Sequence, residues 1–182
     1  MVRLILVGLV VLFMVPDLAA QYRSMFVCWS PCFPDQLLGA MLGGVPHNKA
    51  KWFFELKGKR SGAKGTEYDF SKLLAEDFDD EFKGEKSSIT TIRIGRIFKL
   101  HKERVTVIGL YLGIGIADKT KYLQYYDKYE ILDDEGNYYL DNGGKLLISP
   151  ALGFMIFGKE VMSKFGIDIN PTGVAIGIGY MF

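Results

Sequence analysis

The last eleven residues of the chain, Thr172-Gly-Val-Ala-Ile-Gly-Ile-Gly-Tyr-Met-Phe182, carry the pattern that decides the fold. Side chains on a β-strand point alternately to its two faces, so this stretch has one bulky face and one nearly bare face. The bulky face is apolar and ends in aromatic rings: Val174, Ile176, Ile178, Tyr180 and Phe182. The other face holds only glycine and alanine up to Met181. An ordinary half-buried strand turns polar side chains toward water, whereas this one suits lipid outside and a narrow, crowded lumen inside.

The same two-faced pattern returns over residues 105–117. One face there is mainly aliphatic, from Ile108 to Ile116, and the other contains Gly109, Gly113 and Gly115. Residues 51–59 also alternate, with an oily face opposite a face that carries charge. The sequence predicts eight strands in all, over residues 22–29, 36–45, 51–59, 88–100, 105–117, 145–157, 164–169 and 172–182. Residues 22–29 lack clean alternation, and a short helix is the alternative for residues 36–45.

The connections between these strands alternate in length. Residues 46–50, 101–104 and 158–160 form short turns, and residues 61–87 and 118–144 form long polar segments. Short turns on one side, longer loops on the other and an even strand number are typical of a transmembrane barrel. In lipid every backbone group needs an internal partner, so the sheet must close. The sequence therefore predicts an all-β fold, an eight-stranded antiparallel up-and-down transmembrane β-barrel.

The N-terminus predicts a cleaved signal peptide over residues 1–20, which leaves residues 21–182 as the barrel domain. Arg3 gives a positive start, residues 4–15 form an apolar core, and Ala20 offers a cleavage point. A membrane-anchoring helix is the alternative. It needs roughly twenty apolar residues, and Asp17 ends this run too early.

These features resemble the small eight-stranded outer-membrane proteins of Gram-negative bacteria: the OmpX-type barrels, the OmpA membrane domains and the outer membrane β-barrel families of the Bacteroidetes. The resemblance rests on the signal peptide, the turn–loop alternation, the glycine-rich inner faces and the terminal Tyr180-Met-Phe182. It implies location in the cell outer membrane, contact with outer-membrane lipid, and recognition by the barrel-assembly machinery through Tyr180 and Phe182.

Two residues depart from the barrel pattern. Arg96 shares a face with apolar residues, so its side chain must reach the membrane interface, or a bulge must reverse the faces there. Pro150 cannot donate a hydrogen bond to the sheet and weakens the strand around it.

The two long polar segments are the expected contact surfaces. Residues 69–82 show helical spacing of apolar side chains, and the acidic side chains among them do not match the spacing of a calcium loop. Residues 129–132 and 137–140 flank a turn sequence and predict a hairpin. We expect any extracellular ligand or protein to bind through loops 61–87 and 118–144.

The chain has two cysteines, Cys28 and Cys32, on either side of Pro31. Export permits a disulfide, and a tight turn through residues 30–35 would bring the two thiols together. Two free thiols are the alternative. Three intervening residues do not match the redox motif, which has two.

Five charged residues are predicted to point into the lumen: Glu55, Lys57, Arg93, Lys164 and Asp168. The interior of an eight-stranded barrel is just wide enough for side chains to fill. Buried charges should pair, because an isolated buried charge costs several kcal/mol. A plugged, salt-bridged lumen is the expectation; unpaired and hydrated charges would indicate a narrow channel instead.

The composition limits the other functions. A formal net charge of +1 with scattered basic residues predicts no nucleic-acid partner. The only histidines, His47 and His101, fall in predicted turns without the neighbours of a catalytic arrangement, so no enzyme activity and no cofactor are expected. A soluble lipocalin-like barrel would need large apolar residues facing inward, the reverse of this pattern. The expectation is a structural or surface-interaction barrel.

Overall fold

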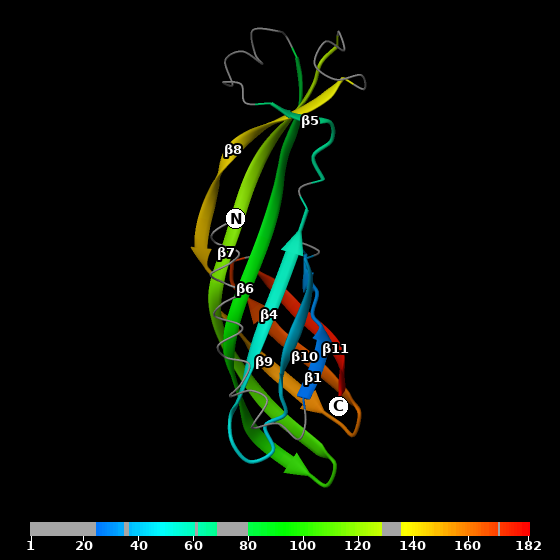
Figure 1. The fold of residues 1–182 in the computed structure, drawn as a ribbon, viewed down its shortest axis with the longest axis vertical. Helices are drawn as coiled ribbons and strands as arrows, with labels where there is room; N and C mark the ends of the chain where they lie inside the picture. The colour runs from blue at the N-terminus through cyan, green and yellow to red at the C-terminus, as the bar shows by residue number, and fades with distance from the viewer. Residues whose placement is uncertain (1–24, 35–36, 61, 69–79, 129–135, 171) are drawn as a thin grey trace.

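The computed structural model describes residues 25–34, 37–60, 62–68, 80–128, 136–170 and 172–182 (Figure 1). The predicted signal peptide and most of the predicted helix over 69–82 lie outside these residues. Among the residues described, no helix is long and apolar enough to cross a membrane.

The described chain consists of β-strands joined by turns. The strands are β1 (Met25–Trp29), β2 (Cys32–Phe33), β3 (Leu38–Gly44), β4 (Lys51–Lys59), β5 (Thr66–Tyr68), β6 (Glu81–Glu103), β7 (Thr106–Tyr126), β8 (Asn137–Ile148), β9 (Ala151–Phe157), β10 (Val161–Asp168) and β11 (Gly173–Met181). Each wall strand pairs antiparallel with its neighbours, in the order β1-β3-β4-β6-β7-β8/β9-β10-β11.

The sheet closes on itself where the first and last strands meet. Phe26 lies opposite Met181 and Trp29 opposite Ile178 in the β1–β11 register. Below them, the backbone amides and carbonyls of Met25 and Phe182 exchange two hydrogen bonds of 2.9 Å. This seam confirms the predicted fold class, a closed eight-stranded antiparallel barrel.

Two wall strands are interrupted at prolines without leaving the wall. β2 continues β1 beyond Pro31, because Cys32 pairs with Ala175 on the same neighbour β11. The predicted loop over 30–35 is therefore wrong at Cys32 and Phe33, which are strand. β8 and β9 form one wall strand around Pro150, since Ile148 and Ala151 keep the same register on β7. Each proline occupies a position where the ladder tolerates a missing donor.

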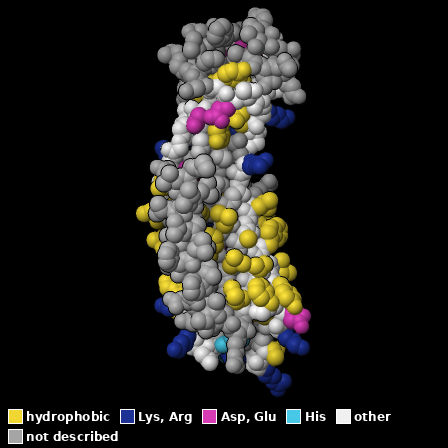
Figure 2. Space-filling view, in the orientation of Figure 1, with side chains coloured by type: hydrophobic (Ala, Val, Ile, Leu, Met, Phe, Trp, Pro, Cys, Tyr) yellow, Lys and Arg dark blue, Asp and Glu magenta, His cyan; other side chains and the backbone are white. Residues whose placement is uncertain are grey.

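Alternation along the strands separates lumen from exterior as predicted. On β11, Ala175 is fully buried and Ile178 is 59% exposed. We call the exposed side chains around the barrel the apolar band (yellow in Figure 2). It comprises Val27, Trp29, Leu42, Trp52, Leu56, Leu112, Ile114, Ile116, Ile148, Leu152, Phe154, Ile156, Phe165, Ile167, Ile169, Val174, Ile176, Ile178 and Tyr180, all between 41% and 67% exposed.

Arg96 lies within this outer surface and shows how the sheet accommodates it. Its guanidinium carbon lies 4.9 Å from the ring centroid of Trp52, over the aromatic face. The faces do not reverse at this position, and the nearest register shift lies lower, between Lys99 and His101. Arg96 therefore reaches outward beside an aromatic ring, the first of the two alternatives.

Two strands, β6 and β7, are much longer than the barrel wall (Figure 1). β6 has 23 residues and β7 has 21, against nine in β4. β6 pairs with β4 only from Ile89 to Ile97, so its first eight residues pair with β7 alone. These parts, with β8 and the parallel strand β5, form a sheet above the barrel that we call the protruding sheet: residues 66–68, 81–88, 118–126 and 137–146.

The protruding sheet corrects the predicted loops. Residues 81–87 and most of 118–144 are strand rather than loop, and Glu81 and Phe82 are strand rather than helix. In the predicted hairpin, residues 137–140 pair with residues 123–126, not with 129–132, which lie outside the described residues. The parts of β6, β7 and β8 in the protruding sheet carry polar side chains on both faces. Their sequence therefore resembles that of a loop.

Close backbone approach inside the barrel gives a test of the packing. A Cβ at Gly115 would lie 1.9 Å from the carbonyl oxygen of Ile92, whereas one at Gly144 would lie 3.6 Å or more from any neighbour. We expect Gly115→Ala to lower the free energy of unfolding by about 1–3 kcal/mol, because overpacking forces the backbone apart. Gly144→Ala should change it by less than about 0.5 kcal/mol. Urea unfolding in detergent measures both, and equal effects would contradict the packing described.

Candidate functional site in the lumen and the protruding sheet

The five predicted lumen charges come together in the upper half of the barrel. Glu55 and Lys57 lie on β4, Arg93 on β6, and Lys164 and Asp168 on β10. All five side chains are at most 1% exposed. Alternation placed each of them on an inner face, and closure of the barrel brings the three strands around one centre.

Two carboxylates hold this cluster together. Arg93 Nη1 lies 2.9 Å from Glu55 Oε2 and 2.9 Å from Asp168 Oδ2. Lys57 Nζ lies 2.5 Å from Asp168 Oδ2 and 3.2 Å from Glu55 Oε1. Lys164 Nζ also donates to Glu55 Oε1. Glu55 therefore contacts all three cations, and it is the centre of the cluster.

Two serines outside the predicted set of lumen charges complete the network. Ser30 Oγ donates to Glu55 Oε1 at 2.7 Å and accepts from Lys164 Nζ at 2.7 Å. Ser149 Oγ accepts from Arg93 Nε at 2.9 Å and from Arg93 Nη2 at 2.7 Å. Both serines lie beside the wall prolines and are fully buried. Alternation continued from Cys28 by two residues would have placed Ser30 on the inner face.

The lumen charges are paired and buried. Three cations face two carboxylates, and every one of them has an ionic partner within the cluster. Lys164 Nζ also lies 4.8 Å from the ring centroid of Tyr111, and the aromatic face supplies further negative potential. The cluster therefore fills the upper half of the lumen with buried ionic pairs.

The predicted disulfide between Cys28 and Cys32 is not formed. Both cysteines are free thiols, fully buried on the inner face. Cys28 lies opposite Gly179 and Cys32 opposite Ala175, so four residues of extended strand separate them. That spacing is about 13 Å, and a disulfide needs Cα atoms within about 7 Å.

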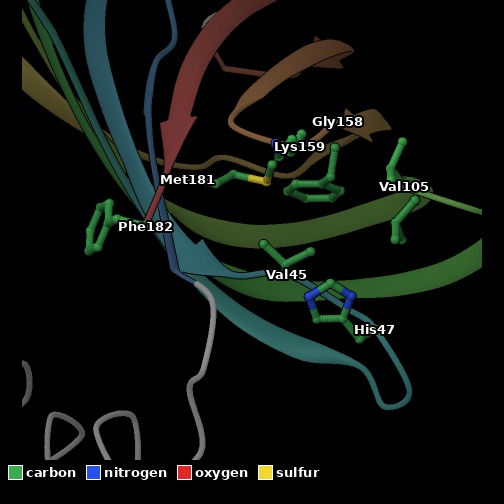
Figure 3. A pocket seen from close by; sticks show the side chains of 9 residues that line it. Val45, His47, Val105, Gly158, Lys159, Met181 and Phe182 are labelled. Carbon is green, nitrogen blue, oxygen red and sulfur yellow. The ribbon is translucent and has the colours of Figure 1, made fainter.

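The lower half of the lumen is apolar. Phe26, Phe53 and Phe157 pack there with the methionines of three strands, Met41, Met155 and Met162. Below them, a hollow of about 150 Å³ opens at the turn end, between Val45, Val107 and Met181 (Figure 3). His47 lies at its rim, where burial and the nearby cations Lys102 and Lys51 lower its pKa.

The histidines do not form a catalytic arrangement in the described part of the chain. His47 lies in the β3–β4 turn, and His101 is exposed near the end of β6. Among the described residues, no group of three or more His, Cys, Asp or Glu side chains could hold a metal ion. The acidic residues 76–79 lie outside the described residues, and Asp80 bonds to a tyrosine.

The protruding sheet has a packed centre of its own. Tyr125 and Tyr138 stack with ring centroids 5.6 Å apart, and Leu123 and Leu140 pack beside them. Tyr138 donates a hydrogen bond of 2.6 Å to Asp80 Oδ2. Burial and this bond raise the pKa of Tyr138 above its usual range, so the hydroxyl stays a donor at neutral pH. The cluster gives the sheet rigidity beyond the barrel.

One edge of this sheet has no strand beside it in the described part of the chain. Residues 81–88 of β6 pair with β7 on one side, and β4 begins to pair only at Ile89. Their exposed side chains include Phe82, Lys83 and Lys86. An open edge presents unpaired backbone donors and acceptors to another chain.

A closed eight-stranded barrel with an apolar exterior, a plugged lumen and strands prolonged on one side is the fold of the small outer-membrane β-barrels. At 10% identity, the structure matches Ail, the attachment invasion locus protein of Yersinia pestis, over 87% of this chain and 95% of Ail, with a TM-score of 0.51. The N-terminal β-barrel domain of Pseudomonas aeruginosa OprF matches with a TM-score of 0.43 and 11% identity, over 87% of this chain and 96% of that domain. No protein-family model matches the sequence, and no curated protein matches it either. The predicted resemblance is confirmed for the fold.

The central position of Glu55 gives a test of the lumen cluster. Glu55→Gln leaves three cations with one carboxylate, so we expect the free energy of unfolding to fall by about 3–5 kcal/mol. Glu85→Gln is the matched control, because Glu85 pairs with Lys121 at 2.9 Å on an exposed surface. It should cost less than about 1 kcal/mol. Urea unfolding in detergent micelles measures the free energy of unfolding of both variants. A small decrease for Glu55→Gln would show that the cluster is hydrated.

Proposed function

We propose that this protein is an integral outer-membrane barrel whose lumen is closed and whose protruding sheet contacts partners outside the cell. The observation that carries the proposal is a difference in pairing along β6. Residues 89–97 pair with both β4 and β7 in the barrel wall, whereas residues 81–88 pair with β7 in the protruding sheet. About ten residues of tilted strand cross a bilayer, and β6 has 23. The remainder stands in water and has no role in spanning the membrane.

The exterior of the barrel supports residence in lipid. The apolar band surrounds the wall with large side chains that a protein in water would bury, and such a surface marks contact with an apolar partner. Tyr180 and Phe182 belong to the final strand and are 54% and 66% exposed, so both are accessible to the assembly machinery. The signal peptide over residues 1–20 supplies export in this proposal.

The contents of the lumen favour an interaction role for the protein rather than a channel function. Ionic pairs occupy its upper half and aromatic and methionine side chains its lower half. A conducting pore needs hydrated, weakly held charges along its length. The protruding sheet offers accessible chemistry: an edge without a neighbouring strand in the described part of the chain, paired charges and exposed aromatic rings.

The orientation of the barrel can be tested with single cysteines in intact cells. Lys86→Cys lies on the protruding sheet and Lys159→Cys in the β9–β10 turn, and both positions are exposed. We expect a membrane-impermeant maleimide to label the first and not the second, and to label both after lysis. The unmodified chain is the negative control and should not be labelled, because Cys28 and Cys32 are buried. Labelling of Lys159→Cys alone in intact cells would show that the barrel has the opposite orientation. Labelling of neither variant would show that the chain is not exposed on the cell surface.

Contact through the sheet can be tested by photo-crosslinking in intact cells. Benzoylphenylalanine in place of Phe82 lies beside the open edge, and the same residue in place of Ile114 lies on the apolar band; the native side chains are 53% and 61% exposed. We expect polypeptide adducts of defined mass from position 82 and only lipid adducts from position 114. Equal protein adducts at both positions would contradict a specific role for the sheet.

A further inference from the structure

Exposed cations gather at the end of the barrel opposite the protruding sheet. We call the following side chains the basic collar: Lys49, Arg96, Lys99, Lys102, Arg104 and Lys159. They come from the β3–β4, β6–β7 and β9–β10 hairpins, whose tips meet at this end. Figure 2 shows dark blue side chains at the lower end of the molecule, below the yellow apolar band.

The charge of the collar is not balanced locally. Among the residues that the structure describes, its six cations share the turn end with two exposed acidic side chains, Glu103 and Glu160. Within the described part of the chain, no collar cation forms a salt bridge. The protruding sheet differs, because Lys83 pairs with Glu81 at 2.7 Å and Lys121 pairs with Glu85 at 2.9 Å. The collar therefore has capacity for an external anion.

The collar adjoins the apolar band directly. Arg96 covers the ring of Trp52, and Phe98 and Leu100 continue the outer surface beyond it, 38% and 54% exposed. Along this stretch of β6, apolar and cationic side chains alternate in position: Arg96, Phe98, Lys99, Leu100 and Lys102. An amphiphile with an apolar tail and an anionic head matches this order, since its tail meets the rings and its head meets the cations.

We propose that the basic collar binds the phosphate groups of anionic phospholipids in the leaflet at the turn end of the barrel. The inference rests on the proposed membrane function, because only an embedded barrel places the collar at headgroup level. Arginine and lysine are the side chains that recognise phosphate, and basic groups beside a bilayer attract anionic lipids. The collar then fixes the depth and tilt of the barrel from its turn side and recruits a shell of anionic lipid there.

Trp52 reports the lipid composition beside the collar. The chain has two tryptophans, so Trp29→Phe leaves Trp52 as the single probe. The full chain is refolded into equimolar phosphatidylcholine and phosphatidylglycerol, with bromine on the acyl chains of one lipid at a time. Each collar cation should favour the anionic lipid by about fivefold at low salt. We expect brominated phosphatidylglycerol to quench Trp52 more strongly, with an enrichment of at least about fivefold, and 1 M salt should abolish the difference.

Matched charge variants assign the effect to the collar. Lys99→Gln, Lys102→Gln and Arg104→Gln together remove three collar cations and should remove most of the enrichment. Lys83→Gln, Lys86→Gln and Lys121→Gln together remove three cations from the protruding sheet and should leave it unchanged. A shift in gel mobility on heating first shows that each variant is folded, and the salt titration of the unmodified collar tests the proposal even if a variant does not fold.

The outcomes separate this inference from the proposed function. Quenching by neither lipid would show that Trp52 lies outside the bilayer and would overturn both. Equal quenching by the two lipids at low salt would leave the membrane barrel intact and overturn the collar inference alone. Equal loss of enrichment in the collar and sheet variants would also overturn it, because net charge rather than the collar would then be the cause.

Discussion

Pairing of the backbone hydrogen-bonding groups is the constraint on which the rest of this structure depends. A sheet with free edges cannot lie in lipid, because each unpaired amide or carbonyl there costs several kcal/mol. The chain meets this constraint where β11 returns to β1, and Met25 and Phe182 complete the seam. Closure at eight strands then fixes a narrow lumen. Glycine on the inner faces lets the aromatic and charged side chains of opposite strands share that space.

The narrow lumen in turn determines the chemistry inside it. In a low-dielectric interior, five charges are stable only with partners and satisfied hydrogen bonds. Glu55 and Asp168 provide the partners, and Ser30 and Ser149 satisfy donors and acceptors that the carboxylates leave over. The lower half needs no such arrangement, because Phe53, Phe157 and the methionines fill it with apolar volume. Ionic pairs and apolar side chains therefore fill the two halves of the lumen.

The exposed chemistry divides between the two ends of the barrel. At one end, β6, β7 and β8 leave the wall and form a sheet with its own aromatic centre and an open edge. At the other end, short hairpins leave no room for a domain, and their tips carry unpaired cations. We propose the first end as the contact surface for a polypeptide and the second as the contact surface for the phosphates of lipid, with the apolar band between them.

The sequence by itself determined the wall: which residues face lipid, which face the lumen, and that the sheet closes. This was possible because the face of a strand residue depends only on its position along the local backbone, as residues 105–117 and 172–182 show. Only the tertiary structure decided which lumen charges meet, that Cys28 and Cys32 stay apart, and that β6 continues far beyond the membrane. Those features depend on the register between strands distant in sequence. Beyond the wall, charged residues and glycines interrupt the few apolar positions of each strand, such as Leu123 and Tyr125. The sequence there looks like a loop until the strands pair.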